Sequence, residues 1–125
     1  MLIKTLLTDK KIKVTIAILI TIGIAILCLV KLGPPPIQVK YADKIQHCIA
    51  YFTLSFAWMY ALVTNMRSLI VIVILCVFYG IIIEVLQMTM TEYRSGELLD
   101  VFANTLGVLL ALAIFRSVFY KKRSI

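Results

Sequence analysis

Four long apolar runs, separated by short polar breaks, make up most of the chain. The runs cover about 14–32, 45–63, 69–88 and 98–119. Each is close to the roughly 20 residues that a helix needs to cross a bilayer. The breaks contain strong helix-ending signals, namely Gly33 with three prolines at 34–36, the polar stretch 64–68, and the Ser95-Gly96 pair. This pattern predicts four membrane-spanning helices.

The third run begins with LIVIVILCVF at 69–78, a composition that favours strands in water. It shows no alternation of polar and apolar positions, and in a bilayer a helix satisfies all its backbone hydrogen bonds internally. We therefore expect an all-α, polytopic four-transmembrane-helix bundle that forms a single domain over 1–125. Hydrophobic residues are 62% and charged residues 15% of the chain, which supports a membrane protein.

The basic residues predict how the bundle is oriented, because Lys and Arg concentrate in cytoplasmic loops. Nine of them lie on one side of a four-helix path, and five of the six acids lie on the other. Both termini are therefore expected in the cytoplasm. The net charge of +7 should attract anionic lipid, and it gives little reason to expect nucleic-acid binding. The first run lacks a small-x-small site before Lys31, so we expect it to remain as an uncleaved helix.

Polar residues inside the apolar runs mark one depth of the predicted bundle. The second run carries them at its outer start, the third at its outer end, and the fourth at its outer start, so all converge near the outer leaflet. Ionisable groups in such segments are costly and usually functional. The candidate residues for an outward-facing polar pocket are Asp43, Lys44, His47, Tyr51, Glu84, Gln87, Arg94, Asp100 and Asn104.

Helical spacing places these residues on stripes that continue into small residues, which allow close helix packing. The stripes are Lys44, His47, Tyr51 and Ser55; Gly80, Glu84 and Gln87; and Asp100, Asn104, Gly107 and Ala111. We therefore expect the carboxylates to face neighbouring helices. The Asn104 amide should find hydrogen-bond partners at Asp100, Glu84 or Gln87. The first helix should be structural, and so should the three cysteines, none of which lies in a CxxC motif.

Several chemistries are open to this set of residues. His47, Glu84 and Asp100 could bind Zn²⁺ or Mn²⁺ if they come within a few ångströms. Lys44 and Arg94 could clamp a phosphate, and a carboxylate with a raised pKa could serve as a general acid. A structural interpretation also stands, in which Glu84 and Arg94 form an ion pair worth about 1 kcal/mol or less. The sequence contains no HExxH, phosphate-loop or dinucleotide motif, so it identifies neither a cofactor nor a reaction.

Four motifs in order carry a resemblance to a known family. They are DKxxHxxxYxxLS at 43–55, GxxxExxQ at 80–87, Arg94, and DxxANxxG at 100–107. Over about 34–114 the chain resembles the VanZ-like family of bacterial integral membrane proteins, although Cys48 stands where an aromatic residue is expected. The resemblance implies about four helices in the bacterial cytoplasmic membrane and an association with resistance to the glycopeptide teicoplanin.

The leading hypothesis is thus a cell-envelope protein whose polar pocket engages a lipid headgroup or a lipid-linked precursor. The alternative is a structural or accessory membrane protein whose polar network only holds helices together and binds a protein partner. A proton pathway is less favoured, because the inner halves of the predicted helices carry no ionisable relay. Whether the protein is an enzyme, and its oligomeric state, are left open.

Overall fold

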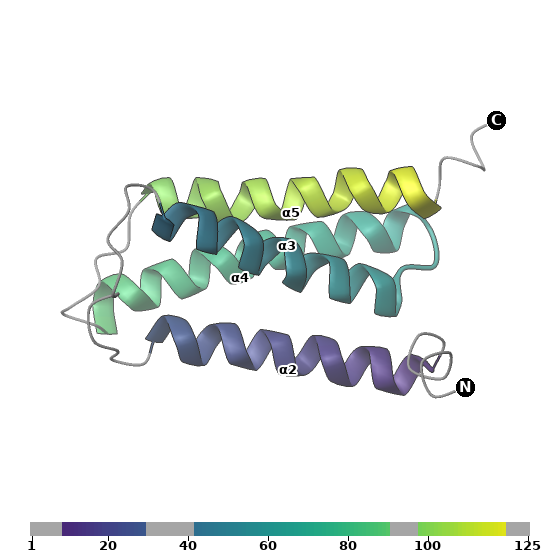
Figure 1. The fold of residues 1–125 in the computed structure, drawn as a ribbon, viewed down its shortest axis with the longest axis horizontal. Helices are drawn as coiled ribbons and strands as arrows, with labels where there is room; N and C mark the ends of the chain where they lie inside the picture. The colour runs from purple at the N-terminus through teal and green to yellow at the C-terminus, as the bar shows by residue number, and fades with distance from the viewer. Residues whose placement is uncertain (1–8, 30–41, 91–97, 120–125) are drawn as a thin grey trace.

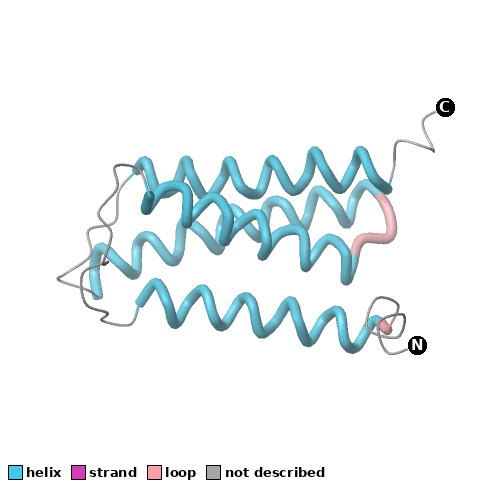
Figure 2. Tube along the Cα trace, in the orientation of Figure 1, coloured by secondary structure: helices cyan, strands magenta, loops and turns pink. Residues whose placement is uncertain are grey.

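Four helices run side by side in the computed structural model, which describes residues 9–29, 42–90 and 98–119. They are α2 (Lys10–Leu29), α3 (Ala42–Leu62), α4 (Met66–Met90) and α5 (Leu98–Phe119). Successive helices point in opposite directions, which gives an up-down-up-down bundle (Figure 1). Within the described ranges the chain forms helices and connecting loops, with no strand (Figure 2). The predicted all-α fold is confirmed.

The helix boundaries differ from the apolar runs at the starts of α2, α3 and α4, each of which begins three or four residues earlier. Capping explains two of these starts, since backbone N–H groups of the first turn need an acceptor whatever the hydrophobicity. The Lys11 backbone N–H donates to Asp9 Oδ1 at 2.9 Å. The Ser68 N–H donates to Asn65 Oδ1 at 2.8 Å, and Ser68 Oγ accepts from the Asn65 N–H at 3.1 Å.

Three of the helices are long and apolar enough to cross a membrane: α2, α4 and α5. They present many large apolar side chains outward, as expected of a surface that meets acyl chains. α3 is less apolar, and it contacts all three other helices. A helix surrounded by protein can carry more polar residues, because fewer of its side chains meet lipid. With 21 residues it is about 32 Å long, and a fourth span through α3 remains a prediction.

The closest helix pair is α3 with α5. A Cβ added at Gly107 on α5 would lie only 2.3 Å from the Cys48 carbonyl oxygen and 2.9 Å from the Phe52 nitrogen of α3. Here backbone meets backbone, which only glycine permits. Buried Leu54 and Met59 from α3 and Val108, Ala111 and Phe115 from α5 belong to the same core.

α2 is joined to the bundle by hydrogen bonds from its neighbours and by Ile24, which belongs to the hydrophobic core. Trp58 Nε1 of α3 donates to Thr21 Oγ1 at 2.8 Å, and the Tyr79 hydroxyl of α4 donates to the Thr21 carbonyl at 2.5 Å. Only Ala17 and Ile24 of α2 are buried. The predicted structural role of this helix is consistent with these contacts.

Candidate functional site

One end of the bundle brings together the polar residues that the sequence spreads over three helices. The C-terminal ends of α2 and α4 and the N-terminal ends of α3 and α5 lie at this end (Figure 1). The predicted stripes are buried: His47, Tyr51 and Ser55 on α3, Gly80, Glu84 and Gln87 on α4, and Asp100, Asn104, Gly107 and Ala111 on α5. The expectation that the carboxylates face neighbouring helices is therefore confirmed.

We name six residues at this end the polar cluster: Lys44, His47 and Tyr51 from α3, Glu84 from α4, and Asp100 and Asn104 from α5. Two close contacts organise it. Lys44 Nζ lies 2.6 Å from Asp100 Oδ1, in a charge-assisted hydrogen bond that joins α3 to α5. His47 Nε2 lies 3.3 Å from Glu84 Oε1, and this contact joins α3 to α4.

The three metal-ligating side chains of the cluster converge. One ligand atom each from His47, Glu84 and Asp100 lies within 4.8 Å of the other two. All three residues are buried, with 8%, 2% and 4% of their surface exposed. Helical geometry explains the convergence, since one residue comes from near the end of each of three adjoining helices.

A second polar layer lies one helical turn deeper into the bundle. Tyr51 follows His47 by four residues and Asn104 follows Asp100 by four, while Gly80 precedes Glu84 by four. A Cβ at Gly80 would lie 3.2 Å from Tyr51 Cε2 and 3.3 Å from Asn104 Nδ2. The missing side chain of Gly80 therefore makes room for both polar residues.

The prediction that Asn104 finds partners at Asp100, Glu84 or Gln87 is wrong for the described part of the chain. Its Oδ1 and Nδ2 make no hydrogen bond there, and neither do the Tyr51 hydroxyl and the two Glu84 oxygens. Sharing a stripe with Asp100 places Asn104 four residues along the same helix, but it does not bring their polar atoms within hydrogen-bonding range. Gln87 instead donates from Nε2 to the Cys28 carbonyl of α2 at 2.9 Å.

Two predicted site residues cannot be placed. Arg94 lies outside the described residues, and so does the Asp43 side chain, although the Asp43 backbone belongs to α3. The proposed Glu84–Arg94 ion pair therefore stays a prediction.

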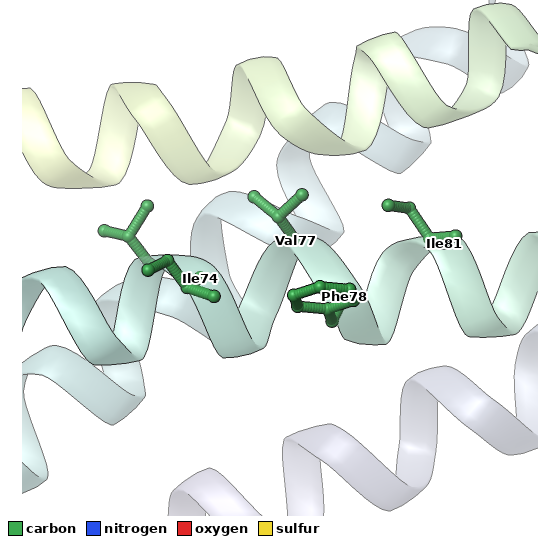
Figure 3. Close-up of a pocket in the computed structure, with 5 residues that line it drawn as sticks. Ile74, Val77, Phe78 and Ile81 are labelled. Carbon is green, nitrogen blue, oxygen red and sulfur yellow. The ribbon is translucent and has the colours of Figure 1, made fainter.

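Apolar hollows elsewhere in the described part of the chain do not include the cluster. One of about 280 Å³ is lined by Val73, Ile74, Val77, Phe78 and Ile81, all on α4 (Figure 3). Another of about 260 Å³ lies between α2, α3 and α4, and its lining includes Thr21, Trp58 and Tyr79. Neither hollow is lined by a residue of the three polar stripes, so both are separate from the polar chemistry.

Sequence reasoning missed the hydrogen bonds of Trp58 and Tyr79 to α2. A signal was present, because a Trp N–H or Tyr O–H in an apolar helix needs a partner. Trp58 donates to the Thr21 hydroxyl, and Tyr79 donates to the Thr21 backbone carbonyl. Which partner it is depends on how the helices are rotated, which periodicity alone does not give.

Comparison with known proteins identifies the family to which the chain belongs. The family model described as VanZ/LLP1 matches residues 12–120. An uncharacterized protein of the yeast Schizosaccharomyces pombe is 35% identical over 91 residues, covering 71% of this chain and 54% of that protein. The chain thus spans about half the length of this relative. No solved structure matches. The described helices and the family match together show that the chain belongs to the VanZ/LLP1 family of membrane proteins.

Proposed function

We propose that the polar cluster binds the phosphate-bearing headgroup of a membrane lipid or of a lipid-linked envelope precursor. The observation that carries the proposal is a set of buried polar atoms that make no hydrogen bond within the described residues: both Glu84 oxygens, both Asn104 side-chain atoms and the Tyr51 hydroxyl. Burying such groups without partners costs a few kcal/mol each, by rough estimates. A ligand from outside the protein would supply the partners.

The chemistry of the cluster suggests which ligand. Lys44 provides a cation for a phosphate, and its side chain is 21% exposed, so it can reach both Asp100 and a headgroup. Glu84 accepts hydrogen bonds only, so it suits an ammonium or hydroxyl group of the same headgroup. Asn104 offers both a donor and an acceptor. A headgroup that combines a phosphate with a donor group, as in phosphatidylethanolamine or a polyprenyl-linked sugar, fits this set.

We place the cluster at the outer leaflet, with both termini in the cytoplasm and all four helices crossing the membrane. The described basic residues near the start of α2, the start of α4 and the end of α5 support this orientation, because these helix ends lie opposite the cluster (Figure 1). They are Lys10, Lys11, Lys13, Arg67 and Arg116. A reporter enzyme or fluorescent protein fused to the C-terminus distinguishes the two sides. Activity of a reporter that works only outside the cytoplasm would overturn this orientation.

Binding is tested by mass spectrometry of the purified protein in detergent after exposure to a total lipid extract. Separate arms contain phosphatidylethanolamine, a polyprenyl diphosphate sugar lipid, and inorganic phosphate. We expect the wild type to retain one lipid class, and Asn104→Leu, Glu84→Ala and Lys44→Gln to lose it. Asp9→Asn changes an exposed carboxylate at the other end of the bundle and should retain the lipid. Retention of phosphate alone would indicate a free-anion site.

The structural alternative has its own support, because Lys44–Asp100 and His47–Glu84 join α3 to α5 and to α4. Under that alternative the variants lose thermal stability. They either retain lipid as the wild type does, or neither they nor the wild type retain any. Either lipid result would overturn the binding proposal.

The proposed physiological role, following the resemblance to VanZ-like proteins, is a contribution to teicoplanin resistance in a bacterial cytoplasmic membrane. Expression of the wild type in a susceptible host should raise the inhibitory concentration of teicoplanin. Asn104→Leu, produced at equal membrane abundance, should not. Equal resistance with the variant would separate resistance from the cluster.

A further inference from the structure

The geometry points to a divalent cation site in which His47, Glu84 and Asp100 bind one Zn²⁺ or Mn²⁺ ion. We infer that this ion is the partner of Glu84 Oε1, the oxygen next to His47, which leaves Glu84 Oε2 for a donor group of the headgroup. The inference rests on the proposed function in one respect: the ion would lie in the same cluster and present its open positions to the lipid phosphate.

Ligand spacing is the first argument. In a tetrahedral zinc site with metal–ligand distances of about 2.0–2.1 Å, neighbouring ligand atoms are about 3.4 Å apart. His47 Nε2 and Glu84 Oε1 lie 3.3 Å apart, yet they do not meet hydrogen-bond geometry. This pair therefore already has the separation of two ligands that share an ion. The third ligand atom, on Asp100, lies within 4.8 Å of the other two and would need to approach by at most about 1.4 Å for the same geometry.

Charge is the second argument. The cluster contains two carboxylates, Glu84 and Asp100, and one ammonium, that of Lys44, whose Nζ lies 2.6 Å from Asp100. Glu84 is 2% exposed, and neither of its oxygens accepts a hydrogen bond within the described residues. A buried carboxylate without compensation is strongly disfavoured. A divalent cation supplies that compensation and uses both carboxylates.

The donor set is the third argument. One imidazole nitrogen with two carboxylate oxygens suits Zn²⁺ and Mn²⁺ better than Ca²⁺ or Mg²⁺, which prefer oxygen ligands. The ligands come from three helices, so the ion would also hold α3, α4 and α5 together at this end. Asp100 would give one carboxylate oxygen to the ion and keep its contact with Lys44, since ligating carboxylates in metal sites are commonly hydrogen-bonded as well.

A protonated His47 paired with Glu84, or a proton on Glu84, would neutralise the same charge without a metal. These are the competing outcomes. In either case the cluster would bind no ion. The effect of Lys44 separates binding of an ion from binding of a headgroup. Removing its positive charge should strengthen binding of a cation, while it weakens binding of a lipid phosphate.

The experiment uses the full chain, purified in detergent, stripped with a chelator and titrated with Zn²⁺ or Mn²⁺ without added lipid. Elemental analysis should find one ion per wild-type chain, and bound Mn²⁺ should be detected by electron paramagnetic resonance. Glu84→Gln, an isosteric change, and His47→Gln, which replaces the imidazole with an amide, should each weaken binding by about tenfold or more. Lys44→Gln should tighten it, and Asp9→Asn should leave it unchanged.

Two results would overturn the inference: a wild type that binds no ion, or unchanged binding in both Glu84→Gln and His47→Gln. If one variant fails to fold, the other decides. Lipid binding is measured separately, so the two proposals fail independently. Ion binding without lipid retention overturns the headgroup proposal alone, and lipid retention without ion binding overturns the metal site alone.

Discussion

Replacing Gly107 with alanine tests the closest helix contact of the bundle. The new Cβ would lie 2.3 Å from the Cys48 carbonyl oxygen, whereas Cβ atoms essentially never approach another heavy atom within 3.0 Å. α3 and α5 must therefore separate by about 0.7 Å, the difference between these two distances. The obstacle is backbone, so no side-chain rotation can relieve it.

The magnitude follows from two opposing effects. Overpacking of a close contact costs about 1–3 kcal/mol, and a backbone clash belongs at the upper end. Alanine recovers about 1 kcal/mol through its higher helix propensity. We expect the free energy of unfolding of Gly107→Ala to fall by about 2 kcal/mol.

Gly23 offers a matched control, because a Cβ there would meet nothing within 4 Å. Gly23→Ala should keep or raise the stability by up to about 1 kcal/mol. Unfolding is followed by far-UV circular dichroism and by the fluorescence of Trp58, the one tryptophan in the chain, as SDS is titrated into detergent micelles. If Gly107→Ala unfolds at the same SDS fraction as Gly23→Ala, the α3–α5 packing described above is wrong.

Two further predictions concern individual hydrogen bonds. Trp58→Phe removes the 2.8 Å hydrogen bond to Thr21 Oγ1 and should lower the free energy of unfolding by about 1 kcal/mol, and most of this loss should disappear when Thr21 is already valine. Unfolding followed by far-UV circular dichroism measures this double-mutant cycle, and losses that simply add would contradict the hydrogen bond. Asn65→Ala removes the cap of α4 and should also lower the free energy of unfolding by about 1 kcal/mol, whereas Asn65→Asp keeps the acceptor for the Ser68 N–H. Equal unfolding midpoints for the two variants would refute the capping role.

The four apolar runs were enough to predict four helices, and helical spacing was enough to predict the stripes that they bury. A bilayer leaves the backbone few alternatives to a helix, so apolar runs translate directly into elements. The bounds of α5 agree with the sequence, but α2 and α4 start earlier because Asp9 and Asn65 cap them. Capping acts on backbone N–H groups, which hydrophobicity does not detect.

For the candidate site, too, the sequence determined one part and the tertiary structure another. Sequence alone determined which residues share a depth and a helix face, because helical spacing and alternating topology fix both for Lys44, His47, Glu84, Asp100 and Asn104. Only the tertiary structure decided which side chains meet across helices. It paired Lys44 with Asp100 and His47 with Glu84, and it directed Gln87 to α2.

The physical reason is that contacts between helices depend on their mutual rotation and distance. Close packing at Gly107 sets how nearly α3 approaches α5, and the space at Gly80 accommodates Tyr51 and Asn104. A one-dimensional pattern contains the residues that permit such packing, but not the positions that they adopt. The sequence thus determined the depth and composition of the polar cluster, and the packing of three helices decided its geometry.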